Sequence, residues 1–126
     1  IKGKITEYIK GAAQNARHGK GSIIMSVLSV TSEAFEKEVI NSDKPVLVDF
    51  YADWCGPCRM MSSVIDEISD ERSDIKVCKI NVDEQPELAE KFQVMSIPTL
   101  IVIKDGTVTN RTSGAIPKQA ILALFN

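Results

Sequence analysis

From residue 27 onwards, two kinds of hydrophobic pattern alternate along the chain. Apolar runs typical of strands occupy residues 27–30, 45–51, 75–82 and 99–104, and a fifth strand is expected over 108–111. Apolar residues at helical spacing predict helices over residues 32–41, 55–70, 86–92 and 117–125. The residues expected to face inward are Met60, Met61, Val64, Ile65 and Ile68 in the second helix and Ala120, Ile121, Leu124 and Phe125 in the last. The predicted order of elements is therefore βαβαβαββα.

The order of these elements restricts how the strands can pair. A helix between two strands acts as a crossover, which joins parallel strands, whereas Asp105-Gly106 between the last two strands predicts a tight antiparallel hairpin. We therefore expect the α/β class, with a mixed central sheet of about five strands flanked by four helices.

Residues 1–24 differ from the rest of the chain. Their apolar positions follow helical spacing up to Ala16, and a run rich in glycine, 18–22, then breaks the pattern. Three interpretations of this N-terminal extension stay open: a remnant of an expression tag that ends before Met25, a basic targeting segment, or a short docking helix plus linker. The domain itself is expected over residues 25–126, and no catalytic residue is expected before it.

Composition and charge narrow the class of protein. The 126 residues are 44% hydrophobic and 25% charged, and no apolar run approaches the roughly 18 residues of a membrane span. Residues 1–24 carry five Lys or Arg against one Glu, a net +4, so the remaining residues carry −6 of the total −2. An acidic body disfavours nucleic acid as the ligand. We expect a soluble monomer with neither a membrane nor a nucleic-acid partner.

The three cysteines do not form the even, dispersed framework of a small secreted protein. Cys55 and Cys58 are separated only by Gly56 and Pro57, and the N-terminal residues lack the apolar core of a signal peptide. A reducing compartment fits this usage better. We therefore expect a cytoplasmic location.

Cys55 and Cys58 lie in the first turn of a predicted helix. At this spacing their Cα atoms are roughly 5–6 Å apart, within the range of a disulfide. Cys55 meets the positive end of the helix dipole, which favours a thiolate, so it is the expected nucleophile. Cys58, a turn deeper, is expected to be more shielded and to attack the mixed disulfide afterwards. Gly56 admits a close backbone approach, and Pro57 restricts the loop.

Other uses of this cysteine pair fit the sequence poorly. A zinc site normally needs four ligands, and only Cys78 and His18 remain as further thiol or imidazole ligands. A cysteine hydrolase needs a histidine base, and His18 lies in the extension. We therefore expect no metal. Cys78 lies within a predicted strand and is expected to be a packing group without a role.

Asp49 interrupts the apolar run of its strand. A carboxylate in a buried strand is costly unless it is protonated or partnered, and burial raises its pKa. Exposure of Asp49 at the strand end is the alternative interpretation.

Several segments resemble the thioredoxin family, in the order in which that family carries them. They are Val48–Cys58, Asn81–Asp83, Ser96–Thr99, Lys104–Gly106 and Ser113–Ala115, and the similarity covers about residues 27–126. The resemblance implies the thioredoxin fold and a thiol–disulfide oxidoreductase that reduces disulfides of protein substrates. It also implies no bound cofactor beyond the Cys55–Cys58 disulfide, and recycling by a thioredoxin reductase that draws on NADPH.

The resemblance also assigns roles to single residues. Asp49 is implied as the proton relay to Cys58, and Lys79 as a residue that tunes Asp49. The peptide bond before Pro98 is implied to be cis, with Pro98 facing the cysteine pair. The backbone of the neighbouring Ile97 is implied to pair with the substrate. The remaining implied substrate contacts are Trp54, Gly56, Pro57 and Gly114.

The chain departs from the family pattern at several positions. Ser62-Ser63 stands where many thioredoxins have a helix-bending proline, and Tyr51 stands where a tryptophan is common. Two rival functions stay open: a disulfide oxidase or isomerase, and a non-catalytic binding subunit.

Overall fold

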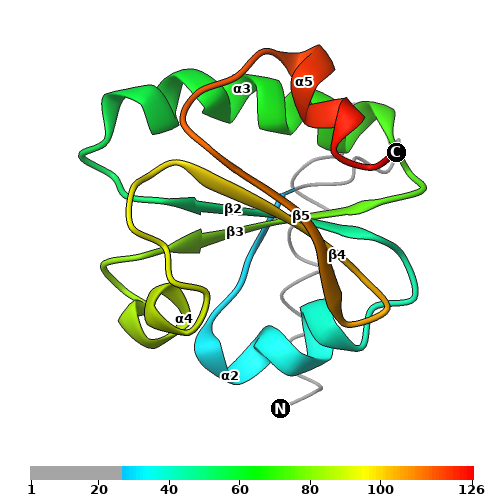
Figure 1. The fold of residues 1–126 in the computed structure, drawn as a ribbon, viewed down its shortest axis with the longest axis horizontal. Coiled ribbons are helices and arrows are strands. Elements are labelled where there is room, and N and C mark those ends of the chain that lie inside the picture. The colour runs from blue at the N-terminus through cyan, green and yellow to red at the C-terminus, as the bar shows by residue number, and fades with distance from the viewer. Residues whose placement is uncertain (1–26) are drawn as a thin grey trace, which may run out of the picture.

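The computed structural model describes residues 27–126, which form one mixed five-stranded sheet with helices on both faces (Figure 1). The sheet order is β1-β3-β2-β4-β5, with β1 and β2 parallel to β3, and β4 antiparallel to both β2 and β5. The strands are β1 (Leu28–Ser29), β2 (Val46–Tyr51), β3 (Lys76–Asn81), β4 (Thr99–Lys104) and β5 (Thr107–Ser113). The expected α/β architecture is confirmed.

The helices form the two outer layers. They are α2 (Ser32–Phe35) with the π-helical turn η1 (Glu36–Ile40), then α3 (Gly56–Glu71), α4 (Pro86–Lys91) and α5 (Lys118–Ala123). Figure 1 shows α3 and α5 over one face of the sheet and α2 with α4 over the other. The helix predicted over 32–41 is thus a single α-helical turn, capped by the Thr31 hydroxyl, that widens into a π-helical turn.

Alternation along β2 builds a hydrophobic core on each face of the sheet. Val48 and Phe50 pack in the layer with Phe35 of α2, whereas Leu47 packs in the layer with Ile65 of α3. The strand is buried on both faces, as its continuous apolar run predicted.

One expectation about an inward-facing residue is wrong. Met60 was expected on the buried face of α3, but it is 72% exposed because Met61, one residue or about 100° further round the helix, takes the inward position. The inward residues expected near the C-terminus fit better: Ile121 of α5 is fully buried and Ala120 is half-buried. Leu124 and Phe125, which follow α5, are half-buried and pack against the core that contains Ile65.

The hairpin between β4 and β5 turns at Asp105 and Gly106, whose φ angles of 50° and 79° are those of a type I′ turn. Strand β5 spans Thr107–Ser113 and is longer than the predicted 108–111. Its residues are almost all exposed and polar, so no hydrophobic alternation marks its ends.

The N-terminal extension predicted over residues 1–24 lies outside the described residues. Within residues 27–126, no helix has the length and apolar character needed to cross a membrane.

Candidate active site

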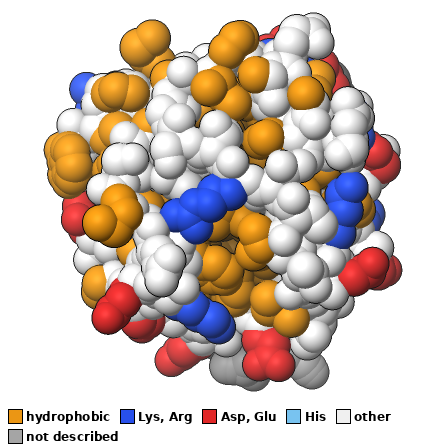
Figure 2. All heavy atoms as spheres, viewed as in Figure 1, with side chains coloured by type: hydrophobic (Ala, Val, Ile, Leu, Met, Phe, Trp, Pro, Cys, Tyr) orange, Lys and Arg blue, Asp and Glu red, His pale blue; other side chains and the backbone are white. Residues whose placement is uncertain are grey.

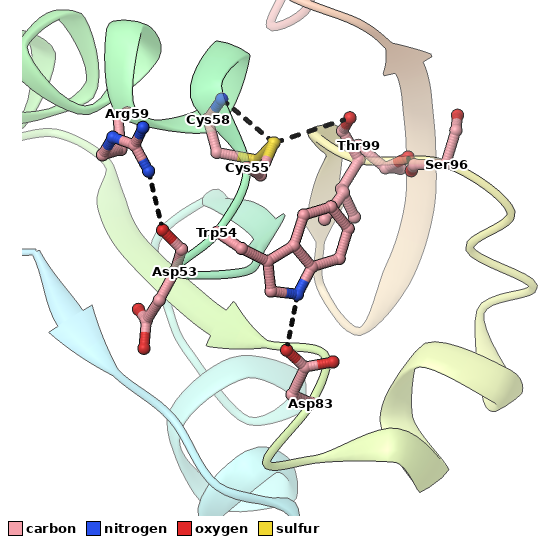
Figure 3. Close-up of a disulfide and its surroundings, with 9 residues drawn as sticks. Asp53, Trp54, Cys55, Cys58, Arg59, Asp83, Ser96 and Thr99 are labelled. Atoms are coloured by element: carbon pink, nitrogen blue, oxygen red, sulfur yellow. Dashed lines mark hydrogen bonds between the residues drawn. A yellow bond between two sulfur atoms is a disulfide. The ribbon is translucent and has the colours of Figure 1, made fainter.

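The two cysteines of the Cys-Gly-Pro-Cys motif lie where β2 leads into α3. Cys55 is the N-cap residue of α3 in an extended conformation, and Cys58 lies in the first turn. They form a disulfide with a Cα–Cα distance of 5.2 Å, inside the expected range. The backbone N–H of Cys58 donates to Cys55 Sγ at 3.2 Å (Figure 3). In the reduced protein the same N–H is available to a Cys55 thiolate, which a helix N-terminus stabilises.

The two cysteines differ in their surroundings but not in their total exposure. Each is 4% exposed, so the expectation that Cys58 is more shielded is wrong for the residue as a whole. Cys55 lines a surface hollow, and Cys58 is not among the residues of that hollow. Of the two cysteines, the structure therefore places only Cys55 at this hollow.

The hollow, which we call the substrate groove, has a volume of about 470 Å³ and runs between two connections. One wall comes from the β2–α3 connection and the other from the α4–β4 connection, including Met95, which is 91% exposed. Figure 2 shows hydrophobic side chains along the left edge of the molecule, where Figure 1 places both connections. The lining residues are Trp54, Cys55, Gly56, Pro57, Val82, Val94, Met95, Ser96 and Ile97.

The α4–β4 connection brings a backbone carbonyl next to Cys55. The Ile97–Pro98 peptide bond is cis, and the Ile97 carbonyl oxygen lies 3.9 Å from Cys55 Sγ. The Thr99 hydroxyl donates to the Ser96 carbonyl at 2.6 Å. Ile97 therefore faces the cysteine pair with its carbonyl oxygen, whereas Pro98 is buried and does not line the groove.

Gly114 follows β5, outside the groove lining. Its N–H donates to the Pro98 carbonyl at 2.8 Å. Its φ is 92°, and a Cβ placed there would meet nothing within 4 Å. Glycine is thus favoured here by a left-handed backbone and not, within this structure, by crowding. A Cβ at Gly56 would also meet open space.

Trp54 stands at the rim of the groove and is held by a residue that the sequence did not single out. Its indole Nε1 donates to Asp83 Oδ2 at 2.9 Å (Figure 3), and the Asp83 N–H donates to Asn81 Oδ1 at 2.8 Å. Asp83 belongs to a motif shared with the family, but nothing in its spacing from Trp54 indicates contact across 29 positions.

We predict that Trp54→Ala raises the KM for a protein disulfide such as insulin by about fivefold to tenfold, because the exposed indole supplies apolar contact to a bound chain. Asp83→Ala, which frees the indole without removing it, should raise KM less. Steady-state kinetics of insulin reduction test this. Unchanged KM in both variants would contradict the assignment of Trp54 to substrate contact.

Asp49 lies inside the sheet, 6% exposed, in β2. Burial raises its pKa to about 7, and the charge of Lys79 opposes this rise. No described residue bonds to Asp49 Oδ1. Because side chains alternate along β2, Asp49 shares the face of Leu47, which is the face that α3 covers.

Lys79 is the partner of Asp49 in the register of β2 and β3. Its ammonium lies 5.6 Å from the ring centroid of Tyr51, two residues along the same face as Asp49. Lys79 therefore lies close enough to lower the pKa of Asp49, although burial dominates.

The third cysteine is part of the hydrophobic core. Cys78 is fully buried in β3, and burial raises the pKa of its thiol to about 12, so it stays protonated. Among residues 27–126 there is no group of three or more His, Cys, Asp or Glu side chains that could hold a metal ion.

The structure thus has a disulfide at the start of a helix, beside an apolar groove, in a domain built on a mixed sheet. This arrangement is that of a protein that exchanges a dithiol and a disulfide with other proteins. Comparison with known proteins identifies its family. Residues 26–126 match the family model Thioredoxin. The chain is 50% identical over 103 residues to thioredoxin of Pyropia yezoensis, covering 81% of this chain and 96% of the relative.

Two bacterial relatives agree. The chain is 51% identical over 98 residues to thioredoxin of Mycobacterium tuberculosis (77% of this chain, 84% of the relative). It is 50% identical over 99 residues to thioredoxin 1 of Synechococcus elongatus (77% and 92%). The chain belongs to the thioredoxin family: it is a thiol–disulfide oxidoreductase that reduces protein disulfides and is recycled by a thioredoxin reductase.

Proposed function

We propose that Cys55 is the attacking thiolate. The observation that carries this role is the position of its sulfur, which accepts the N–H of Cys58 at the start of α3 and lines the substrate groove. Cys55 Sγ attacks one sulfur of the substrate disulfide, forms a mixed disulfide, and releases the other substrate sulfur as a thiolate that takes a proton. Cys58 Sγ then attacks Cys55 Sγ, which forms the Cys55–Cys58 disulfide and releases the second substrate thiolate.

Asp49 is the proposed proton relay for the second step. Cys58 must lose its thiol proton as it attacks, and a carboxylate with a pKa of about 7 is well matched to accept it. Support comes from the buried position of Asp49 on the sheet face that α3, the helix of Cys58, covers. Lys79 tunes this group by favouring its ionised form.

The substrate is proposed to bind as an extended segment along the groove. The backbone of Ile97, beside Cys55, pairs with this segment, and cis Pro98 sets the direction of the loop. The other proposed contacts are Trp54, Gly56, Pro57 and Gly114, of which the first three line the groove.

The electrons are proposed to come from NADPH through the reductase, with no cofactor bound to the chain itself. We propose that the protein is a cytoplasmic monomer whose thioredoxin domain spans residues 25–126. Its proposed partners are proteins that contain disulfides, and neither nucleic acid nor a membrane is a proposed partner. The acidic balance of the residues after position 24 supports the absence of nucleic acid.

A coupled assay tests this proposal. NADPH, a thioredoxin reductase and insulin are mixed with the full chain, and NADPH consumption is followed by absorbance. We expect consumption that requires both insulin and the chain. If the chain instead oxidises reduced substrates and its couple proves strongly oxidising, the oxidase or isomerase interpretation replaces this one. Sedimentation of the purified chain by itself tests whether it is a monomer.

A further inference from the structure

Helix α4, which precedes one wall of the substrate groove, ends in a Schellman motif. The N–H of Val94 donates to the Ala89 carbonyl at 2.9 Å, and the N–H of Gln93 donates to the Glu90 carbonyl at 3.0 Å. Gln93 takes the left-handed position, with φ of 51°, where glycine is usual. This turn sets the direction in which the chain leaves α4 and enters residues 94–97. These residues form the wall of the substrate groove that comes from the α4–β4 connection.

The carbonyls at this helix end are bound by one side chain from β5. Arg111 Nη1 donates to the Phe92 carbonyl at 2.5 Å, and Arg111 Nη2 donates to the Gln93 carbonyl at 2.7 Å. A guanidinium at a helix C-terminus is also favoured by the helix dipole. The planar fork of arginine reaches two adjacent carbonyls at once, which a lysine cannot do with the same geometry.

The other end of the wall is fastened to β4 and to the end of β5. The Thr99 hydroxyl holds the Ser96 carbonyl and lies 3.1 Å from the Ser113 hydroxyl, while the Gly114 N–H holds the Pro98 carbonyl. Arg111 lies opposite Ile101 in the β4–β5 register, further along the hairpin. Residues 94–97 are therefore held at both ends, and at the α4 end Arg111 adds two hydrogen bonds to those of the Schellman motif.

Val94 and Ile97 of the wall also pack against the hydrophobic core that contains Phe35. Met95 is almost fully exposed, and Val94, Met95 and Ser96 all line the substrate groove. Arg111 has no carboxylate partner among residues 27–126, so its guanidinium is committed to the two carbonyls.

We propose that Arg111 is a positioning residue for the substrate groove. It fixes where the wall 94–97 stands relative to Cys55, and so sets how well an extended protein segment fits between the two walls. The proposal rests on the proposed function of the groove. Arg111 should therefore affect the reduction of protein disulfides, because a bound protein segment contacts both walls. It should have little effect on the reduction of small disulfides, because these need only Cys55.

The test compares Arg111→Ala and Arg111→Lys with Arg72→Ala. Arg72 is the matched control because it pairs with Asp74 after the far end of α3. For Arg111→Ala we expect the KM for insulin to rise about fivefold to tenfold. Arg111→Lys should lie in between, and Arg72→Ala should match the wild type. The rate with bis(2-hydroxyethyl) disulfide should stay within about twofold in all three.

Amide hydrogen exchange provides a readout that does not depend on activity. Arg111→Ala should accelerate exchange of the Gln93 and Val94 amides, which close the Schellman motif, and Arg72→Ala should not. Unchanged exchange together with an unchanged KM for insulin would overturn the proposal. So would an equal loss of rate with insulin and with the small disulfide. If the wild type itself failed to reduce insulin, the proposed function would fail, whereas the exchange result would still decide the positioning role.

Discussion

Cys55→Ser eliminates the reduction of insulin disulfides, with a loss of at least about a thousandfold in rate. A serine hydroxyl at the start of α3 is a far weaker nucleophile than a thiolate, and Cys58 does not line the groove to replace it. Insulin precipitation driven by dithiothreitol measures the loss, against the uncatalysed rate.

Cys58→Ser should behave differently, because Cys55 still attacks but no second thiol releases the substrate. Mixed disulfides between the chain and insulin should then accumulate and be visible on a non-reducing gel. Cys78→Ala is the matched control, since this buried thiol stays protonated, and we expect its activity to equal that of the wild type. Retained activity in Cys55→Ser, or trapping by Cys55→Ser in place of Cys58→Ser, would refute the order of attack.

Asp49→Asn stabilises the oxidised protein in a pH-dependent way. The pKa of Asp49 is raised from 3.8 to about 7 in the folded state. Between these values the unfolded chain has lost the proton while the folded protein keeps it, so the free energy of unfolding of the wild type falls as pH rises. Relative to Asp49→Asn, the wild type should lose about 4 kcal/mol of its free energy of unfolding between about pH 4 and pH 8. Below about pH 4 this pH dependence disappears, because Asp49 is then protonated in both the folded and the unfolded state.

Urea unfolding of both proteins at pH 4 and pH 8 measures this difference. Asp74→Asn is the control, because the hydrogen bond from Arg72 lowers the pKa of Asp74 to about 2, so its stability difference from the wild type should be nearly the same at pH 4 and pH 8. Its carboxylate favours the folded state above pH 4, and that contribution is lost as pH falls toward 2. A stability difference between wild type and Asp49→Asn that is the same at both pH values would contradict a buried, protonated Asp49.

The elements that pack both faces of β2 could be predicted from the sequence with nearly correct bounds. Strand β2 and helix α3 have strong apolar patterns because they form the core, and a pattern that reflects burial is visible without coordinates. The interrupted apolar run at Asp49 pointed in the same way to a buried carboxyl, and the structure places it inside the sheet.

Features that depend on contacts between distant polar residues could not be predicted. Strand β5 carries little apolar pattern, so its length was underestimated. The bonds from Trp54 to Asp83 and from Arg111 to the end of α4 join residues 29 and 18–19 positions apart. Such polar contacts depend on the register of the strands and leave no periodic signal in the sequence. The exposure of Met60 was missed for another reason, because adjacent apolar residues in a helix do not determine which of them faces inward.

The most direct test of the central role of Cys55 is its titration. Thiolate absorbance in the ultraviolet is recorded against pH for the reduced protein and for Cys55→Ser. We expect a step well below the ordinary thiol pKa of about 8.5, absent from Cys55→Ser, because the start of α3 offers its N–H groups to the sulfur. Absorbance that rises only at or above pH 8.5, or a low step that persists in Cys55→Ser, would contradict the account.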